Sequence, residues 1–165
     1  KMPLYSYIWN LANPNFAEKT LAPPSALCTM VFNSKHQDVI AGGSYNGSLS
    51  FFDMRKGNSS VLKPTETTIL ELSHHEPVYD IYWLTVGKTG TECISTSTDG
   101  RLLFWDMRKL KDGPYDTLLL EDTYGEDSHK KILGGTSLEY NPEAGPLKYL
   151  VGSEQGYVIQ CAKRK

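Results

Sequence analysis

A six-residue string occurs twice in nearly the same form, as FFDMRK at 51–56 and FWDMRK at 104–109. Each copy follows a pair of turn-forming residues, Asn-Gly at 46–47 before the first and Asp-Gly at 99–100 before the second. Because these residues tolerate the positive φ of a tight hairpin turn, each pair predicts a β-hairpin whose second strand ends in the string. The two copies therefore predict one structural unit that is used twice.

The spacing inside this unit extends the repeat to both ends of the chain. In each hairpin the turn glycine stands five residues before an aromatic residue, Phe52 or Trp105. The same spacing joins Gly156 to Cys161, and the stretch LYSYIWN resembles the closing strand of an earlier unit that ends at Trp9. The four aligned positions are 43, 53 and 56 residues apart. Periods of this size are typical of β-propellers and solenoids.

Further short strands are predicted between the hairpins. A strand that ends in an aromatic residue precedes each hairpin, at 25–33, 78–83 and 134–142. An apolar strand follows each DMRK copy after a polar loop, at 67–73 and 116–122. No helical period has comparable strength, so each complete unit is predicted to contain four short β-strands. Four strands in about 40–45 residues that close on Trp-Asp are the pattern of a WD40 blade.

The predicted fold is therefore all-β, a fragment of a WD40 β-propeller with four-stranded antiparallel blades, two complete and two partial. The predicted division is the end of a blade at 1–22, blades at 23–73 and 74–122, and the start of a further blade at 123–165. Because a ring of seven blades needs roughly 280–320 residues, the chain is expected to be a slice of a larger protein. Its outermost sheets are then expected to be unpaired and prone to aggregation.

The second unit also resembles a WD40 repeat in its polar residues. The resemblance implies a hydrogen-bonded set of four residues, His74, Ser97, Asp99 and Trp105. Such a set satisfies polar groups that would otherwise destabilise the interior of a blade. The matching positions differ in the other units, with Asn46 and Phe52 in the first and Lys131, Gln155 and Cys161 in the last. Only the second unit is therefore expected to hold the full set.

Four longer segments resemble the propeller of an axonemal dynein intermediate chain, nearest to the outer-arm intermediate chain 2 type. The segments are 7–35, 90–109, 137–142 and 152–158. The resemblance implies a non-catalytic scaffold without cofactors, assembled in the cytoplasm and located in the axoneme of a cilium or flagellum. It also implies that the propeller binds the tail of a dynein heavy chain, beside a second dynein intermediate chain and other axonemal dynein or docking subunits. The family's light-chain-binding N-terminal region has no counterpart in this sequence, so the resemblance does not extend to a light-chain contact.

The composition disfavours several other classes of protein. A net charge of −2 and an isoelectric point near 6.1 argue against nucleic acid or an anionic membrane as a partner. No apolar run is long enough to span a bilayer. The three cysteines are widely spaced, which predicts reduced thiols rather than a disulfide framework or a zinc site.

Motifs that suggest catalysis or metal binding each have a simpler interpretation. The string VGKTG at 86–90 lacks the earlier glycine of a phosphate-binding loop, so it is interpreted as a turn. His74 and His75 have no acidic or thiol partner at the spacing of a metal site. Asp53 and Asp106 end strands of different units, and neither is predicted to lie beside a nucleophile.

Exposed loops at the strand ends are the candidate partner contacts. The candidate residues are Arg55, Lys56, Arg108 and Lys109. A solvated basic turn is the alternative interpretation, and the charged loop 121–131 is a second candidate surface. Trp-Asp-Met-Arg at 105–108 also resembles the motif by which some WD40 proteins dock on cullin-type ubiquitin ligases, so a ligase substrate receptor is an alternative function. An enzyme with a site in the propeller channel is a further alternative, and it requires a cluster of titratable groups that the sequence does not show.

Overall fold

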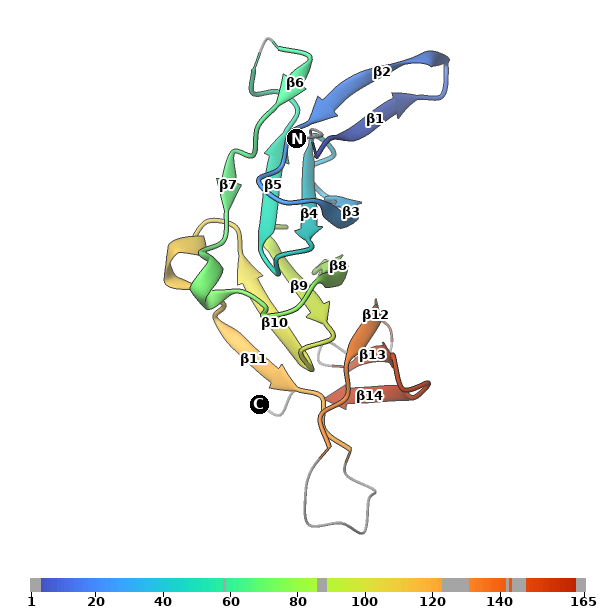
Figure 1. The fold of residues 1–165 in the computed structure, drawn as a ribbon, viewed down its shortest axis with the longest axis vertical. Coiled ribbons are helices and arrows are strands. Elements are labelled where there is room, and N and C mark those ends of the chain that lie inside the picture. Colours follow the sequence, from blue (N-terminus) through green and yellow to red (C-terminus); the bar gives the residue numbers. More distant parts are fainter. Residues whose placement is uncertain are drawn as a thin grey trace.

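Within the described residues, β-sheets follow one another along the chain (Figure 1). The structure is a computed structural model and describes residues 4–57, 59–85, 89–122, 131–141, 143 and 148–162. The first sheet contains β1 (Ser6–Asn10), β2 (Asn13–Leu21) and β6 (Val61–Leu62). The second contains β3 (Leu27–Phe32), β4 (Val39–Ser44), β5 (Leu49–Asp53) and β7 (Glu66–Thr67).

The remaining two sheets continue the same order. The third contains β8 (Val78–Trp83), β9 (Glu92–Ser97), β10 (Arg101–Asp106) and β11 (Asp116–Leu119). The last contains β12 (Gly135–Tyr140), β13 (Lys148–Ser153) and β14 (Val158–Ala162). In both four-stranded sheets each strand pairs antiparallel with the next. The prediction of two complete blades flanked by two partial ones is therefore confirmed.

The hairpins that carry the DMRK strings form as predicted. β4 and β5 pair from Val39 opposite Asp53, and β9 and β10 pair from Glu92 opposite Asp106. The turn glycines Gly47, Gly100 and Gly156 have φ of 89°, 77° and 85°. Backbone of this hand is disfavoured for residues with a Cβ, which explains why glycine occupies the same place in each hairpin.

The strand predicted at 67–73 is mostly absent. Only Glu66–Thr67 pairs with β5, and Leu70–Leu72 forms a short 3₁₀ helix, η1. The hydroxyl of Ser73 donates to the carbonyl of Ile69 and lies 2.7 Å from the hydroxyl of Thr68. These local bonds bend the chain away from the sheet, and they compete with strand pairing as serine and threonine often do.

The first sheet contains two strands that the sequence pattern did not indicate. β2 returns antiparallel along β1, and the short β6 then pairs in parallel with the end of β2. In the sequence β6 lies between β5 and β7 of the second sheet, yet it belongs to the preceding sheet. Leu62 of β6 is buried in the cluster that joins the two sheets.

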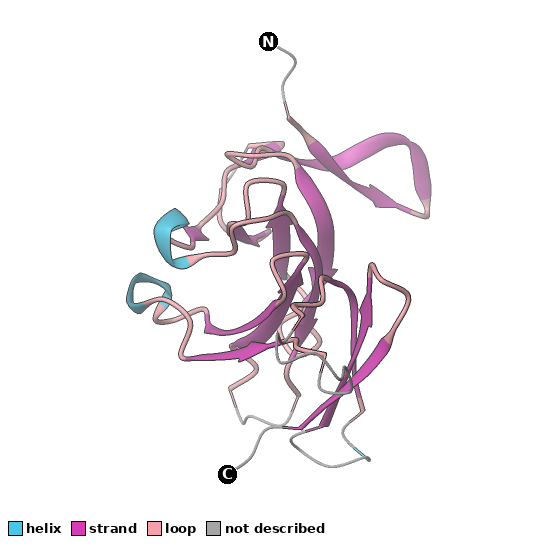
Figure 2. Cartoon of the chain, turned by 60° about the horizontal axis from the view of Figure 1, so that its bottom comes forward, coloured by secondary structure: helices cyan, strands magenta, loops and turns pink. Residues whose placement is uncertain are grey.

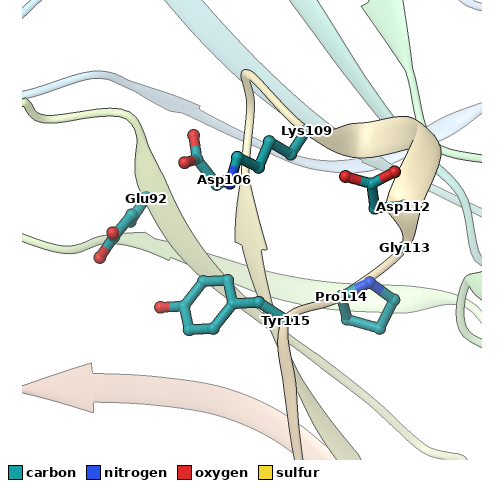
Figure 3. Close-up of a pocket in the computed structure, with 7 residues that line it drawn as sticks. All are labelled: Glu92, Asp106, Lys109, Asp112, Gly113, Pro114 and Tyr115. Atoms are coloured by element: carbon teal, nitrogen blue, oxygen red, sulfur yellow. The ribbon is translucent and has the colours of Figure 1, made fainter.

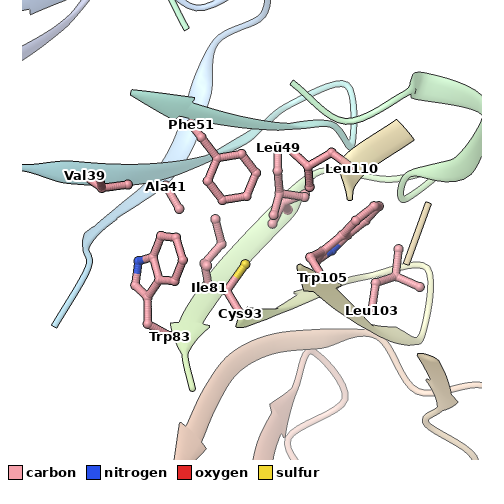
Figure 4. Close-up of a cluster of buried hydrophobic side chains, with 11 residues drawn as sticks. Val39, Ala41, Leu49, Phe51, Ile81, Trp83, Cys93, Leu103, Trp105 and Leu110 are labelled. Atoms are coloured by element: carbon pink, nitrogen blue, oxygen red, sulfur yellow. The ribbon is translucent and has the colours of Figure 1, made fainter. Parts of the chain in front are cut away.

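Neighbouring sheets pack face to face through apolar side chains. Figure 4 shows the largest of these clusters, in which Phe51 from the second sheet lies near Trp83, Cys93 and Trp105 from the third. Phe51 and Trp83 meet edge to face with ring centroids 5.8 Å apart. A second cluster joins the third and last sheets, and a third joins the first and second.

The repeat places equivalent side chains on equivalent faces. Phe51 and Phe104 face the sheet that follows their own, whereas Phe52 and Trp105 face the sheet that precedes it. Cys161 also packs against the preceding sheet. In the view of Figure 2, η1 lies beside a second 3₁₀ helix, η2 (Leu110–Asp112), on one side of the chain. None of the described helices is long and apolar enough to cross a membrane.

Candidate functional site

A buried polar network lies between the second and third sheets. His74 directly follows η1 and only 1% of its surface is exposed. Its Nδ1 lies 3.1 Å from both carboxylate oxygens of Asp99, and its Nε2 lies 2.8 Å from the hydroxyl of Ser95. The indole Nε1 of Trp105 donates to the same hydroxyl at 2.9 Å. Nδ1 of His74 donates to the carboxylate and Nε2 shares a hydrogen bond with Ser95, so the side chains of this network bond one another.

The serine in this network is Ser95, and the prediction of Ser97 was wrong. Both residues lie on the same face of β9, but Trp105 pairs with Cys93, which places its indole diagonally next to Ser95. Ser97 lies too far along the strand, and its hydroxyl instead donates to the carbonyl of Glu76. The alternation of side chains along β9 predicts that Ser95 and Ser97 share one face, so it could not decide which of them bonds His74.

Asp99 is ionised and strongly held. Burial alone would raise the pKa of Asp99, but hydrogen bonds from His74 and from the backbone of His75 and Arg101 lower it on balance. Arg101 also contacts the carboxylate, with Nε 3.5 Å from Oδ2. These contacts fix the hairpin turn to the segment that enters the blade, so the network acts as a structural clamp.

The last sheet replaces this network with apolar side chains. The backbone N–H of Gly134 donates to Gln155 at 3.1 Å, as the N–H of His75 donates to Asp99 in the blade before it. This match puts Leu133 at the position of His74, and the prediction of Lys131 there was wrong. Leu133, Val151 and Cys161 thus stand where His74, Ser95 and Trp105 stand. Replacing all partners of a buried polar set together leaves no group unsatisfied.

The two DMRK strings form the same ion pair. In the first, Arg55 Nε and Nη2 donate to the two carboxylate oxygens of Asp53 at 3.0 and 2.9 Å. In the second, Arg108 Nε and Nη2 donate to Asp106 at 3.0 and 2.7 Å. Each carboxylate also accepts the backbone N–H of its arginine. The aspartate side chains are nearly buried, at 11% and 12% exposed, while the arginine side chains are 63% and 54% exposed.

Both aspartates of these pairs keep their charge in acid. The hydrogen bond from Arg55 holds the pKa of Asp53 below its usual value of 3.8, and that from Arg108 does the same for Asp106. A carboxyl group whose pKa is lower in the folded state stabilises the fold above its unfolded pKa, and this contribution is lost as the pH falls through the folded-state value. The folded chain should therefore lose stability below about pH 4.

The acid dependence can be measured with a matched variant. The thermal unfolding midpoint of Asp53→Asn/Asp106→Asn should change less between pH 5 and pH 3 than that of the unmodified chain. Asp80, whose pKa is raised by burial, acts in the opposite direction but is the same in both proteins. Parallel curves for the two proteins would contradict the assigned ion pairs.

A hollow of about 340 Å³ lies beside the second DMRK string (Figure 3). Glu92, Asp106, Asp112 and Tyr115 contribute polar groups to its wall. Burial, reinforced by the nearby Glu92, raises the pKa of Tyr115, so the phenol stays protonated at neutral pH. No nucleophile with an adjacent base lines this hollow, and within the described ranges no cluster of three histidine, cysteine or acidic residues could hold a metal.

The remaining sequence candidates fall on loops. Lys56, Lys109 and His75 are exposed. Of the VGKTG turn, 86–88 lie outside the described residues, and so do 123–130 of the charged loop 121–131. The sequence reading missed Asn33, which is buried and donates to the carbonyl of Gly90 at 2.7 Å, joining the loops of two blades. The sequence indicates this contact only weakly, because Asn33 is simply a polar residue that directly follows the aromatic end of a predicted strand.

Comparison with known proteins gives the family of this fold. No family model matches the chain. The 70 kDa intermediate chain of flagellar outer-arm dynein from Chlamydomonas reinhardtii is 42% identical over 163 residues, which are 99% of this chain and 27% of that protein. Ciliary dynein intermediate chain 3 of Heliocidaris crassispina is 45% identical, and human dynein axonemal intermediate chain 2 is 44% identical; each match covers 96% of this chain and 25% of the relative. The chain is homologous to a segment of the axonemal dynein intermediate chains.

The homology confirms the resemblance found in the sequence, including its outer-arm type. The chain spans about a quarter of the length of the curated relatives it matches. The relatives are named for flagella, cilia and the axoneme, which agrees with the predicted location. The region of similarity to the axonemal dynein intermediate chains includes both complete blades and both partial sheets.

Proposed function

We propose that the chain is part of a non-catalytic scaffold of an outer-arm dynein, with a propeller that binds the heavy-chain tail. A second dynein intermediate chain and other axonemal or docking subunits lie beside it in this proposal. The scaffold helps to assemble the motor and anchor it on doublet microtubules for ciliary beating. We also propose 1–22, 23–73, 74–122 and 123–165 as the division into blades.

The observation that carries this proposal is the homology to named dynein intermediate chains over 96–99% of the chain. The geometry supports a scaffold, because the buried side chains of the histidine network in the second blade bond one another. His74 and Asp99 form a bonded pair, and Ser95 is bonded to both His74 and Trp105. These bonds brace the blade, and they occupy the polar side chains of the network.

A segment exchange tests the proposal. In Chlamydomonas reinhardtii, the matched segment of the 70 kDa intermediate chain would be replaced by this chain, in cells that lack the unmodified protein. We expect axonemes that retain outer-arm heavy chains, measured by quantitative mass spectrometry against tubulin. A control exchange with an unrelated WD40 segment of equal length should not retain them. Absence of heavy chains from the first strain, with the exchanged protein present at normal level, would contradict the proposal.

A cullin-type ligase receptor is the rival function, because Arg108 of the Trp-Asp-Met-Arg motif is more than half exposed. Affinity capture of the exchanged protein distinguishes the two. Recovery of a ligase adaptor that depends on Arg108, without any dynein subunit, would favour the rival.

A further inference from the structure

Two arginines on neighbouring blades are held in the same orientation. Arg55 and Arg108 each leave the end of the third strand of a four-stranded blade and fold back onto an aspartate two residues earlier. The bonds use Nε and Nη2 of each guanidinium, and the rest of each group faces solvent. A planar guanidinium fixed in this way keeps further N–H groups available for a second acceptor.

The pre-orientation favours binding at these positions. A free arginine side chain loses conformational entropy when it enters an interface, typically about 0.5–1.5 kcal/mol for a flexible side chain. Asp53 and Asp106 have already restricted Arg55 and Arg108 in the folded chain. Arginine is also among the residues that contribute most to protein interfaces.

Both arginines lie on one connected surface of loops. The loop after β3 meets the end of β5, where the backbone N–H of Met54 donates to the carbonyl of Asp38. The loop after β8 meets the end of β10, where the N–H of Met107 donates to Thr91. Asn33 bonds Gly90 across the two blades, so the loops form one surface.

Lysines surround the arginines on this surface. Lys56 follows Arg55, and Lys109 and Lys111 line a hollow of about 410 Å³ together with Arg108. Glu66 and Asp112 line the same hollow, so the cations of this surface stand among carboxylates.

The charges on this surface fit isolated carboxylates better than a polyanion. Asp38 and Asp112 lie among the cations, and each arginine is next to an aspartate. A nucleic acid carries a dense row of phosphates, about one charge per 1.7 Å of duplex, which these carboxylates would repel. A protein segment can place its glutamate and aspartate side chains at the arginines alone.

We infer that Arg55 and Arg108, oriented by Asp53 and Asp106 and flanked by Lys56 and Lys109, form a docking surface for an acidic segment of a partner protein. The inference rests on the proposed function, in which the partner is a dynein subunit. It assigns the contact to the loop surface at the ends of the third strands.

The test uses the exchanged intermediate chain in Chlamydomonas reinhardtii, tagged and captured from solubilised axonemes. With the variant Arg55→Glu/Arg108→Glu, the recovered amount of at least one dynein subunit should fall about tenfold or more relative to the unmodified exchange. Asp53→Asn/Asp106→Asn removes the ion pairs but keeps the arginines, so its recovery should fall less than that of the arginine variant. Glu76→Lys, an exposed charge reversal in the segment that enters the third sheet beside its hairpin turn, should leave recovery unchanged.

The outcomes separate the inference from the function on which it rests. If the unmodified exchange recovers no dynein subunit, the proposed function fails and the inference fails with it. If it recovers them and Arg55→Glu/Arg108→Glu recovers them equally, only the inference is overturned. A loss of recovery in the arginine variant that is matched by a lowered thermal unfolding midpoint would assign the arginines to folding alone, which also overturns it.

A zero-length crosslink identifies the chemistry of the partner. Carbodiimide joins lysine amines to carboxylates, so Lys56 and Lys109 should be joined to glutamate or aspartate residues of a dynein subunit. Crosslinks from these lysines only to carboxylates of this chain would overturn the inference. Recovery that disappears after nuclease treatment would assign the surface to nucleic acid and overturn it as well.

Discussion

Replacing Trp105 with alanine should lower the free energy of unfolding by about 3–5 kcal/mol. The side chain is fully buried between two blades, where it packs with Cys93 and Leu103. Its removal also takes away the N–H that donates to Ser95, although Ser95 keeps its bond to His74. Most of the effect therefore comes from the cavity. Denaturant unfolding followed by circular dichroism measures the change.

Two controls divide this effect into its parts. Trp105→Phe keeps most of the ring and removes the donor, so it should destabilise the chain by about 1–2 kcal/mol. Trp9→Ala removes the same side chain from a position that is 54% exposed, and its effect should be below about 1 kcal/mol. Equal losses at Trp9 and Trp105 would show that the buried contacts between the blades do not form.

Replacing Gly47 with alanine should cost about 3 kcal/mol or more, from two sources. The backbone has φ of 89°, which disfavours any residue with a Cβ. An added Cβ would also collide with the carbonyl group of His74, whose carbon would lie 2.7 Å away. The N–H of His74 donates to the carbonyl of Gly47. A shift of the backbone that relieves the collision would therefore also move His74 within its hydrogen-bonded network.

Gly156→Ala is the matched control for this variant. Gly156 occupies the same hairpin position with φ of 85°, but no atom lies within 4 Å of a Cβ built there. Its substitution should therefore cost only the backbone term, about 1 kcal/mol. Thermal unfolding of both variants measures the difference, and equal shifts would contradict the close contact between the turn and His74.

The parts of the fold that depend on local chemistry could be predicted from the sequence. The hairpin turns follow from Asn-Gly and Asp-Gly pairs, and the strands β3, β8 and β12 follow from short apolar runs that end near an aromatic residue. Because the turn residues also fix the start of each paired strand, the equivalence of Phe52 with Trp105 was readable as well.

The parts that depend on contacts between strands could not be predicted in this way. Ser95 and Ser97 share a face of β9, and only the pairing of Cys93 with Trp105 decides between them. The position of Leu133 depends on how the connection to the last sheet enters, which Gly134 and Gln155 reveal only in three dimensions. The bent segment after β7 depends on hydroxyl bonds that strand propensity does not include.

The small strand β6 has a consequence for how such a protein comes apart. It belongs to one repeat in the sequence but completes the sheet of the repeat before it. Its Leu62 is buried in the cluster between the two sheets. A cut between residues 22 and 23, where the repeats suggest a boundary, would remove β2 and leave Leu62 uncovered. The segment that repeats in the sequence and the sheet that forms are therefore out of phase at this junction, and the first and second sheets are expected to unfold together.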